Sequence, residues 1–182
     1  MVKKKIKIVL DADVIIHFAK GEMLSSLPLV FPECEFVVLD IVKQEVKQPT
    51  LLQLQNQINF LQNIKEIVFG ETTEQIREYA RLTSEIGLGR GESACMVYCR
   101  YNNDVVGSSN LRDITNYCEE HHITYLTTLD FLFYGIQRKI WSKKDADDFI
   151  VNVNSKGSKL HTVDFDTYNA KALGSIEAGA SV

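Results

Sequence analysis

Apolar residues along the chain form two kinds of pattern. In some places they make short unbroken runs bounded by polar or turn-forming residues, which is typical of buried strands. Elsewhere they recur three or four positions apart, which is typical of helices with one apolar face. The short runs predict strands at residues 6–10, 36–39, 105–107 and 123–126.

Helical patterns fill the intervals between these strands. They cover residues 41–46, 51–64, 73–86 and 92–99, with two further helices starting at Asn110 and Ser142. The stretch 92–99 is almost wholly apolar, so we expect its helix to be deeply buried. Strands that alternate with helices predict a parallel sheet covered on both faces.

Length and composition indicate a globular domain. The chain has 182 residues, of which 45% are hydrophobic, and this is enough to bury a sizeable core. The helical pattern fades beyond Asn154, and the last residues, 174–182, are rich in Gly, Ala and Ser. We therefore expect a domain over 1–157 and a partly disordered C-terminal extension over 158–182.

The net charge and the spacing of the cysteines restrict the classes of function that the sequence favours. A net charge of -4 argues against broad electrostatic binding to nucleic acid, although cations bound by carboxylates would restore attraction to phosphate locally. The four cysteines lack the spacing of a zinc ribbon or a disulfide framework, so we expect buried thiols. No apolar run approaches the roughly 18 residues of a membrane span, and the apolar segment after Lys3–Lys5 is too short and too interrupted for a signal peptide, which predicts a cytoplasmic protein.

Asp11 ends the first apolar run, and Asp13 follows it closely. One interpretation makes Asp11 the cap of the next helix. The other makes it a metal ligand, because functional groups of open parallel sheets gather at the carboxyl ends of the strands and carboxylates suit hard cations.

Three more acids lie at element boundaries. Glu45 borders the apolar side of its short helix, Glu92 opens the buried helix after a glycine cluster, and Asp113 follows Asn110 at a helix start. Each has an ordinary explanation: a surface residue for Glu45, a helix-dipole partner for Glu92, and an Asn-x-x-Asp cap for Asn110 and Asp113.

The order and context of these acids resemble the PIN-domain family over roughly residues 5–155. The motifs that carry the resemblance are Ile-Val-Leu-Asp11 with Val14-Ile15-Ile16, Val42-Lys-Gln-Glu45-Val46, Gly89-Arg-Gly-Glu92-Ser-Ala and Val105-Val-Gly-Ser-Ser-Asn110-Leu-Arg-Asp113. The resemblance implies a Rossmann-like three-layer α/β/α sandwich with a central parallel sheet of four to five strands. Residues 1–157 would then be the PIN-like domain.

The resemblance further implies an Mg²⁺- or Mn²⁺-dependent endoribonuclease that acts on RNA, as in the toxins of toxin-antitoxin pairs. Asp11, Glu45 and Glu92 match three family acids. At the fourth family acid this chain has Asn110, and Asp113 is the nearest carboxylate. We expect Asp11, Glu92, Asp113 and Asn110 to hold the metal and Glu45 to orient the attacking water. The resemblance leaves open whether the chain binds an antitoxin protein and whether it forms a homodimer.

Two other interpretations remain. Asp11 and Asp13 also resemble the nucleophile and acid of haloacid-dehalogenase-like phosphatases, for which Lys143, Lys144, Asp147 and Asp148 would have to complete the site. Alternatively, Asn110 marks a PIN-like module that lost its chemistry and binds RNA or protein. Candidates for a phosphate-binding rim are Arg90, Arg100 and Arg112.

Overall fold

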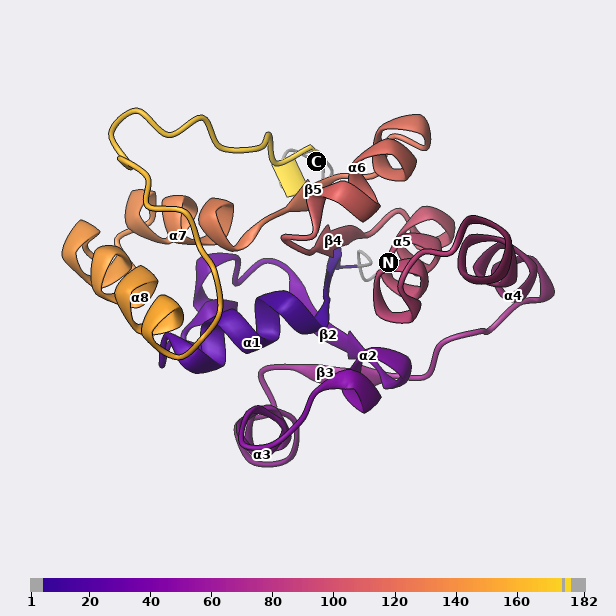
Figure 1. Ribbon diagram of the computed structural model, residues 1–182, viewed down its shortest axis with the longest axis horizontal. Helices are drawn as coiled ribbons and strands as arrows, with labels where there is room; N and C mark the ends of the chain where they lie inside the picture. The colour runs from indigo at the N-terminus through magenta and orange to yellow at the C-terminus, as the bar shows by residue number, and fades with distance from the viewer. Residues whose placement is uncertain (1–4, 175, 178–182) are drawn as a thin grey trace.

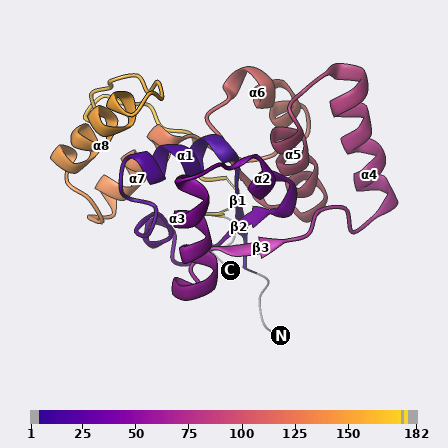
Figure 2. The same cartoon turned by 60° about the horizontal axis from the view of Figure 1, so that its bottom comes forward.

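The protein folds around a single sheet of five parallel strands. The computed structural model describes residues 5–174, 176 and 177, with helices on both faces of the sheet (Figures 1 and 2). The predicted α/β class and three-layer sandwich are thereby confirmed. The strands are β1 (Lys7–Leu10), β2 (Glu35–Leu39), β3 (Lys65–Ile67), β4 (Val105–Gly107) and β5 (Tyr125–Leu126).

The strand order is β3-β2-β1-β4-β5, and the order determines where a site can form. From β1 the chain first builds the sheet outward through β2 and β3, and it then returns to the other side of β1 for β4 and β5. Val9 in the central strand lies opposite Val37 of β2 and Val106 of β4. The reversal leaves a crevice at the carboxyl ends of β1 and β4, where open α/β sheets bind their ligands.

The helices divide between the two faces (Figures 1 and 2). On one face α1 packs against α3, α7 and α8, and on the other α5 packs against α4 and α6. A short helix, α2, contacts α5 at the carboxyl edge of the sheet. Their bounds are α1 (Ala12–Lys20), α2 (Asp40–Glu45), α3 (Thr50–Asn56), α4 (Thr73–Ala80), α5 (Arg90–Asn102), α6 (Leu111–Glu120), α7 (Thr128–Gln137) and α8 (Lys143–Ser155).

The edge strand β3 is absent from the sequence prediction, which ran a helix from 51 to 64. The helix α3 ends at Asn56 and passes through a π-helical turn at 57–61 before the chain turns into β3. Lys65 and Glu66 are exposed because β3 lies at the edge of the sheet. An edge strand with polar side chains lacks the apolar run that marks a buried strand.

Other predicted features agree with the structure. The helix α5 is buried along almost its whole length, and α8 begins with the capping box of Ser142 and Asp145. All four cysteines are buried free thiols. Within the described residues, no helix is long and apolar enough to cross a bilayer.

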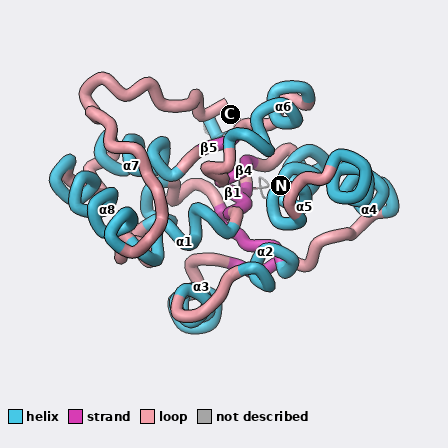
Figure 3. Tube along the Cα trace, in the orientation of Figure 1, coloured by secondary structure: helices cyan, strands magenta, loops and turns pink. Residues whose placement is uncertain are grey.

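After α8, residues 156–174 form no helix or strand and follow the surface of the domain (Figure 3). Residues 156–174 pass over α1 and α7 and return toward β5 (Figure 1). The side chains of Phe165 and Leu173 are buried against the domain, which fixes the path of this segment. Residues 175 and 178–182, part of the extension expected to be partly disordered, lie outside the described residues.

Candidate acidic site at the carboxyl edge of the sheet

Asp11 lies at the crevice between β1 and β4. Its backbone N–H donates to Gly107 O of β4 at 2.8 Å, and its side chain is only 2% exposed. One carboxylate oxygen, Oδ1, accepts from Ala12 N at 2.8 Å and so caps α1. The other, Oδ2, accepts from Ser108 Oγ at 3.0 Å. Asp11 is therefore a helix cap, as one interpretation held, and also a buried acid at the position where a ligand would bind.

Asp13, which the PIN-like interpretation left beside the site, is part of the same cluster. Its Oδ2 accepts a hydrogen bond from Ser109 N at 2.7 Å, which joins the first turn of α1 to the loop after β4. Burial raises the pKa of Asp13 to about 6, against the effect of this hydrogen bond. In the sequence, Asp13 was marked only by its position two residues after Asp11. Only the fold places it against Ser109.

Glu92 enters the crevice from the other face of the sheet. It lies in the first turn of α5, whose first residues follow Gly89. The position suits a carboxylate, because the N-terminal end of a helix carries partial positive charge. A Cβ on Gly89 would collide with Glu92 Oε2, so the glycine leaves room for this side chain to fold back over the start of the helix.

Glu45 reaches the site from the last turn of α2. Its side chain is largely exposed, but Oε1 accepts a hydrogen bond from Gly91 N at 3.1 Å. A Cβ on Gly91 would lie 2.5 Å from Glu45 Oε2 and 3.0 Å from Asp11 Oδ1. Gly91 is therefore the point toward which the carboxylates of Glu45 and Asp11 converge. The glycine cluster was recognised in the sequence, but this role was not.

The side chain of Asn110 connects Glu92 to Asp113. It occupies the N-cap position of α6, yet its side chain makes no capping bond. Instead Asn110 Nδ2 donates to Glu92 Oε1 and to Asp113 Oδ2, both at 2.9 Å. The Asn-x-x-Asp arrangement considered from the sequence is therefore correct in position, with Asn110 at the N-cap and Asp113 in the first turn, but the capping hydrogen bond is missing because the amide is oriented with Nδ2 toward the two carboxylates.

The acids influence one another's ionisation. Burial raises the pKa of Asp11 well above its usual range, and the charges of Asp13 and Glu92 raise it further. Partial burial and the charge of Glu92 likewise raise the pKa of Glu45. The charge of Glu92 thus raises the pKa of both Asp11 and Glu45. The structure therefore gathers Asp11, Glu45, Glu92 and Asp113, with Asn110 between two of them, into one anionic cluster.

The donor set of this cluster suits a hard divalent cation. All the side-chain donors are carboxylate or amide oxygens, the ligands that Mg²⁺ and Mn²⁺ prefer. The absence of a side chain at Gly91 lets oxygens of Glu45 and Asp11 approach the same point of the backbone. As the side chains stand, no group of three or more His, Cys, Asp or Glu side chains among the described residues has metal-binding geometry. The amide hydrogens of Asn110 hold Glu92 and Asp113 instead, so a cation would have to replace these hydrogen bonds.

The residues required by the phosphatase interpretation lie on α8, away from Asp11. Phe149, in the middle of α8, packs against Gly21 at the end of α1, whereas Asp11 caps the start of α1. Lys143 pairs with Asp166, and Lys144 pairs with Asp148. The four α8 side chains named for that interpretation are exposed.

The three arginines considered for a phosphate-binding rim lie in different places. Arg112 pairs with Asp113 at 3.3 Å and is exposed at the border of the acidic cluster. Arg90 is exposed at the start of α5, and its charge offsets a small part of the rise in the pKa of Glu45. Arg100 lies near the opposite end of α5 and pairs with Glu78. Only Arg90 and Arg112 therefore border the site.

Comparison with known proteins adds no family assignment. No protein-family model and no curated protein matches the chain.

Proposed function

We propose that the protein is a metal-dependent endoribonuclease of the PIN-domain type. The observation that carries the proposal is the gathering of Asp11, Glu45, Glu92 and Asp113 at the topological switch point of a parallel sheet. Carboxylates arranged in this way are a recurrent means of holding divalent ions for phosphodiester hydrolysis. A toxin of a toxin-antitoxin pair acting on RNA in the cytoplasm is the biological setting that the proposal favours.

In the proposed site, Asp11, Glu92 and Asp113 would hold Mg²⁺ or Mn²⁺, and Asn110 would join them through its amide oxygen after a rotation of the amide. A metal bound there would supply a water of lowered pKa and positive charge to offset that of the phosphate in the transition state. This role of Asn110 requires its Oδ1 to take the place that Nδ2 now has. The two N–H donors that Nδ2 directs at Glu92 and Asp113 would then be replaced by one acceptor oxygen.

The other residues of the site position these groups. Ser108 Oγ holds Asp11 through its hydrogen bond to Oδ2. Gly91 N fixes one oxygen of Glu45 and leaves the other free to accept a proton from water. Because the pKa of Glu45 is raised, its carboxylate is a stronger base than a glutamate of ordinary pKa, as a group that orients and deprotonates water requires.

Cleavage of a labelled single-stranded RNA tests the proposal. We expect cleavage with Mn²⁺ or Mg²⁺ and none with EDTA, and Asp11→Asn should lower the rate about 100-fold or more. Asp147→Asn is the matched control, because Asp147 is exposed on α8, and it should cleave like the wild type.

Three outcomes would contradict the nuclease. Purified protein without metal-dependent cleavage is one, and an Asp11→Asn variant as active as the Asp147→Asn variant is another. The third is Asp11-dependent hydrolysis of a phosphomonoester with RNA left intact, which would support the phosphatase alternative. RNA binding without metal binding or cleavage would support the non-catalytic module.

A further inference from the structure

A cavity of about 460 Å³ adjoins the acidic cluster on the α1 side of the sheet. Asp13 and Ser109, which are joined by a hydrogen bond at the site, both line this cavity. Its volume lies in the range of small-ligand sites. A molecule bound there would lie directly beside the carboxylates.

The C-terminal segment forms one wall of this cavity, and a buried acid holds it in place. Tyr168 Oη and Lys171 N both donate to Asp130 Oδ1, at 3.0 and 2.9 Å. Asp130 is 1% exposed, and its other oxygen accepts from the backbone and hydroxyl of Thr127. The charge of Asp130 is thus compensated by four hydrogen bonds. The wall is therefore fixed before any ligand binds.

The lining combines an apolar surface with cationic groups. The apolar part suits a flat ring, whereas the cations suit an anion. The apolar and aromatic members are Leu111, Leu129, Leu160, Val163 and Tyr168, and the basic members are Lys159, His161, Lys171 and the half-buried His17. An aromatic ring joined to a phosphate has both features, and the bases and phosphates of a nucleic acid strand supply them together.

Two of the basic side chains are available to a ligand. Lys159 and His161 are exposed, and their side chains have no hydrogen-bond or ion-pair partner in the described part of the chain. The ammonium of Lys171 donates to Tyr125 Oη at 2.9 Å. In a chain of net charge -4, the ammonium groups of Lys159 and Lys171 lie beside an anionic cluster that would otherwise repel phosphate.

Part of the cavity lining is polar, because His17 and Ser109 both line it. His17 Nδ1 and Ser109 Oγ both lie 2.9 Å from Oγ1 of Thr128, which is buried behind them, so an imidazole and two hydroxyls form a connected group. Burial lowers the pKa of His17 to about 4, which keeps the ring neutral near pH 7. Neutral imidazole and hydroxyl groups can exchange hydrogen bonds with the hydroxyls of a ribose.

We propose that this cavity binds the base and ribose of the nucleotide next to the phosphate at the acidic cluster, with Lys159 and Lys171 contacting the phosphate of that nucleotide. The identity of the ligand rests on the proposed function. The cavity deepens that function, because it would hold the RNA strand in register with the carboxylates.

Binding of a fluorescent single-stranded RNA tetranucleotide in EDTA tests this inference without any cleavage. We expect saturable binding that Lys159→Glu weakens about tenfold, as the loss of one charged phosphate contact would. Lys139→Glu changes charge equally at an exposed position outside the lining and should change the dissociation constant less than about twofold. Addition of 5′-UMP or 5′-AMP should shift the methyl resonances of Leu129, Leu160 and Val163.

No saturable binding, or equal weakening by Lys159→Glu and Lys139→Glu, would overturn the inference. Methyl shifts confined to other parts of the protein would do the same. If RNA is cleaved in an Asp11-dependent manner but Lys159→Glu leaves both binding and KM unchanged, the cavity assignment fails and the nuclease stands. If the tetranucleotide binds through Lys159 but no RNA is cleaved, the cavity assignment stands and the nuclease fails.

Discussion

The side-chain amide of Asn110 donates a hydrogen bond to Glu92 Oε1 at 2.9 Å and thereby joins the loop after β4 to the first turn of α5. The same amide group donates to Asp113 Oδ2. Partial positive charge on the amide hydrogens therefore lies between two carboxylates that would otherwise repel each other. Asn110 thus offsets part of the repulsion between Glu92 and Asp113, as the proposed cation would.

Asn110→Asp should convert this contact from attraction to repulsion. Without metal, the loss of two charge-assisted hydrogen bonds should lower stability by about 2 kcal/mol, which corresponds to a decrease in Tm of roughly 4–8 °C. With Mn²⁺, the added carboxylate should tighten metal binding and raise the cleavage rate. Thermal melts in EDTA and in Mn²⁺, with cleavage assays beside them, measure both effects.

The control for Asn110→Asp is Asn116→Asp, because Asn116 is exposed on the same helix. It should change neither the Tm in EDTA nor the affinity for Mn²⁺ appreciably. A variant Asn110→Asp that melts like the wild type in EDTA, or binds Mn²⁺ no more tightly, would contradict the role given to the amide.

Divalent metal should stabilise the wild-type protein, because it relieves repulsion among the clustered acids. At a metal concentration one hundred times the dissociation constant, mass action gives about 2.7 kcal/mol, or an increase in Tm of roughly 5–10 °C. Asp11→Asn should lose most of this increase. Differential scanning fluorimetry with MgCl₂ or MnCl₂, against KCl at equal ionic strength, measures it. Equal melting temperatures in all three salts would argue against a metal site.

Gly91→Ala should impair function more than folding. The new Cβ would crowd Glu45 Oε2 and Asp11 Oδ1, so we expect roughly a tenfold loss of cleavage. The Tm should change little, because alanine favours a helix over glycine by about 0.5–1 kcal/mol and offsets part of the crowding. Measuring kcat and Tm for the same preparation separates the two effects.

Ser93→Ala serves as the comparison for Gly91→Ala in the same turn of α5. Ser93 Oγ is buried without a hydrogen-bond partner among the described residues, so its removal should leave activity intact. If Gly91→Ala and Ser93→Ala are equally active, the carboxylates do not depend on the space at Gly91.

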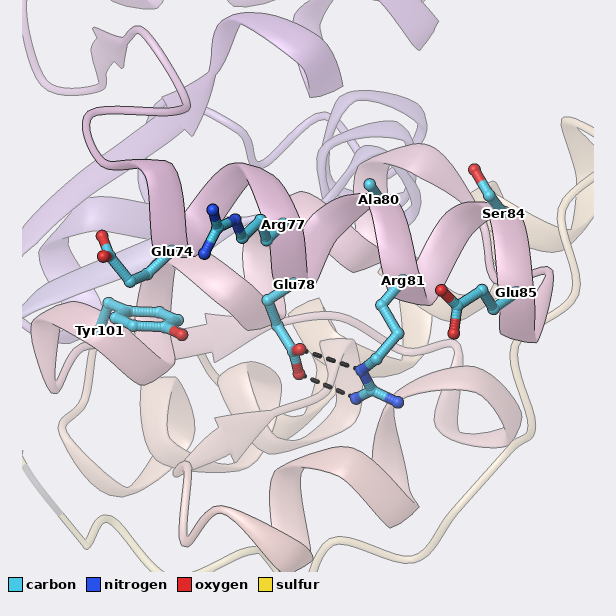
Figure 4. A pocket seen from close by; sticks show the side chains of 8 residues that line it. All are labelled: Glu74, Arg77, Glu78, Ala80, Arg81, Ser84, Glu85 and Tyr101. Atoms are coloured by element: carbon cyan, nitrogen blue, oxygen red, sulfur yellow. Dashed lines mark hydrogen bonds and ion pairs between the residues drawn. The ribbon is translucent and has the colours of Figure 1, made fainter.

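Glu78 should contribute to stability through charge alone, on the side of the sheet away from α1. Figure 4 shows its carboxylate facing Arg81 on the next turn, with oxygen-to-nitrogen distances of 2.9 and 3.0 Å. Arg100 and Tyr117 donate to the same carboxylate and connect α4 to α5 and α6. The hydrogen bonds from Arg81 and Tyr117, with the charges of both arginines, lower the pKa of Glu78 to about 2.

Because the folded state favours the charged form of Glu78, its stabilisation is full above pH 4.5 and is lost as the pH falls toward 2. Glu78→Gln should remove about 1–2 kcal/mol at pH 7, a value reduced for solvent screening, and should flatten the acid limb of the stability curve. Urea unfolding between pH 2.5 and 7 measures this. The same acid dependence in wild type and variant would show that other carboxylates account for it.

Much of the fold follows from the local pattern of the sequence. The apolar run at 6–10 is the centre of the sheet, the run at 105–107 pairs with it, and the apolar helix after Gly91 is buried, because buried strands and helices leave continuous apolar stretches. The polar strand β3 left no such signal, and the two residues of β5 were too few to set its boundaries. The strand predicted at 123–126 therefore contains β5 but is longer than it, whereas β3 could not be placed without its neighbour β2.

The sequence by itself determined which carboxylates stand at the ends of elements: Asp11 after a strand, Glu45 and Glu92 on short stretches of helix, and Asp113 after a later strand. Only the tertiary structure decided that these positions meet, because the reversal of strand order places the ends of β1 and β4 side by side. It also decided that the side chain of Asn110, at the N-cap of α6, donates to Glu92 and makes no capping hydrogen bond, since α5 brings a carboxylate that is distant in sequence within reach of Nδ2. Local spacing carries no information about such a neighbour.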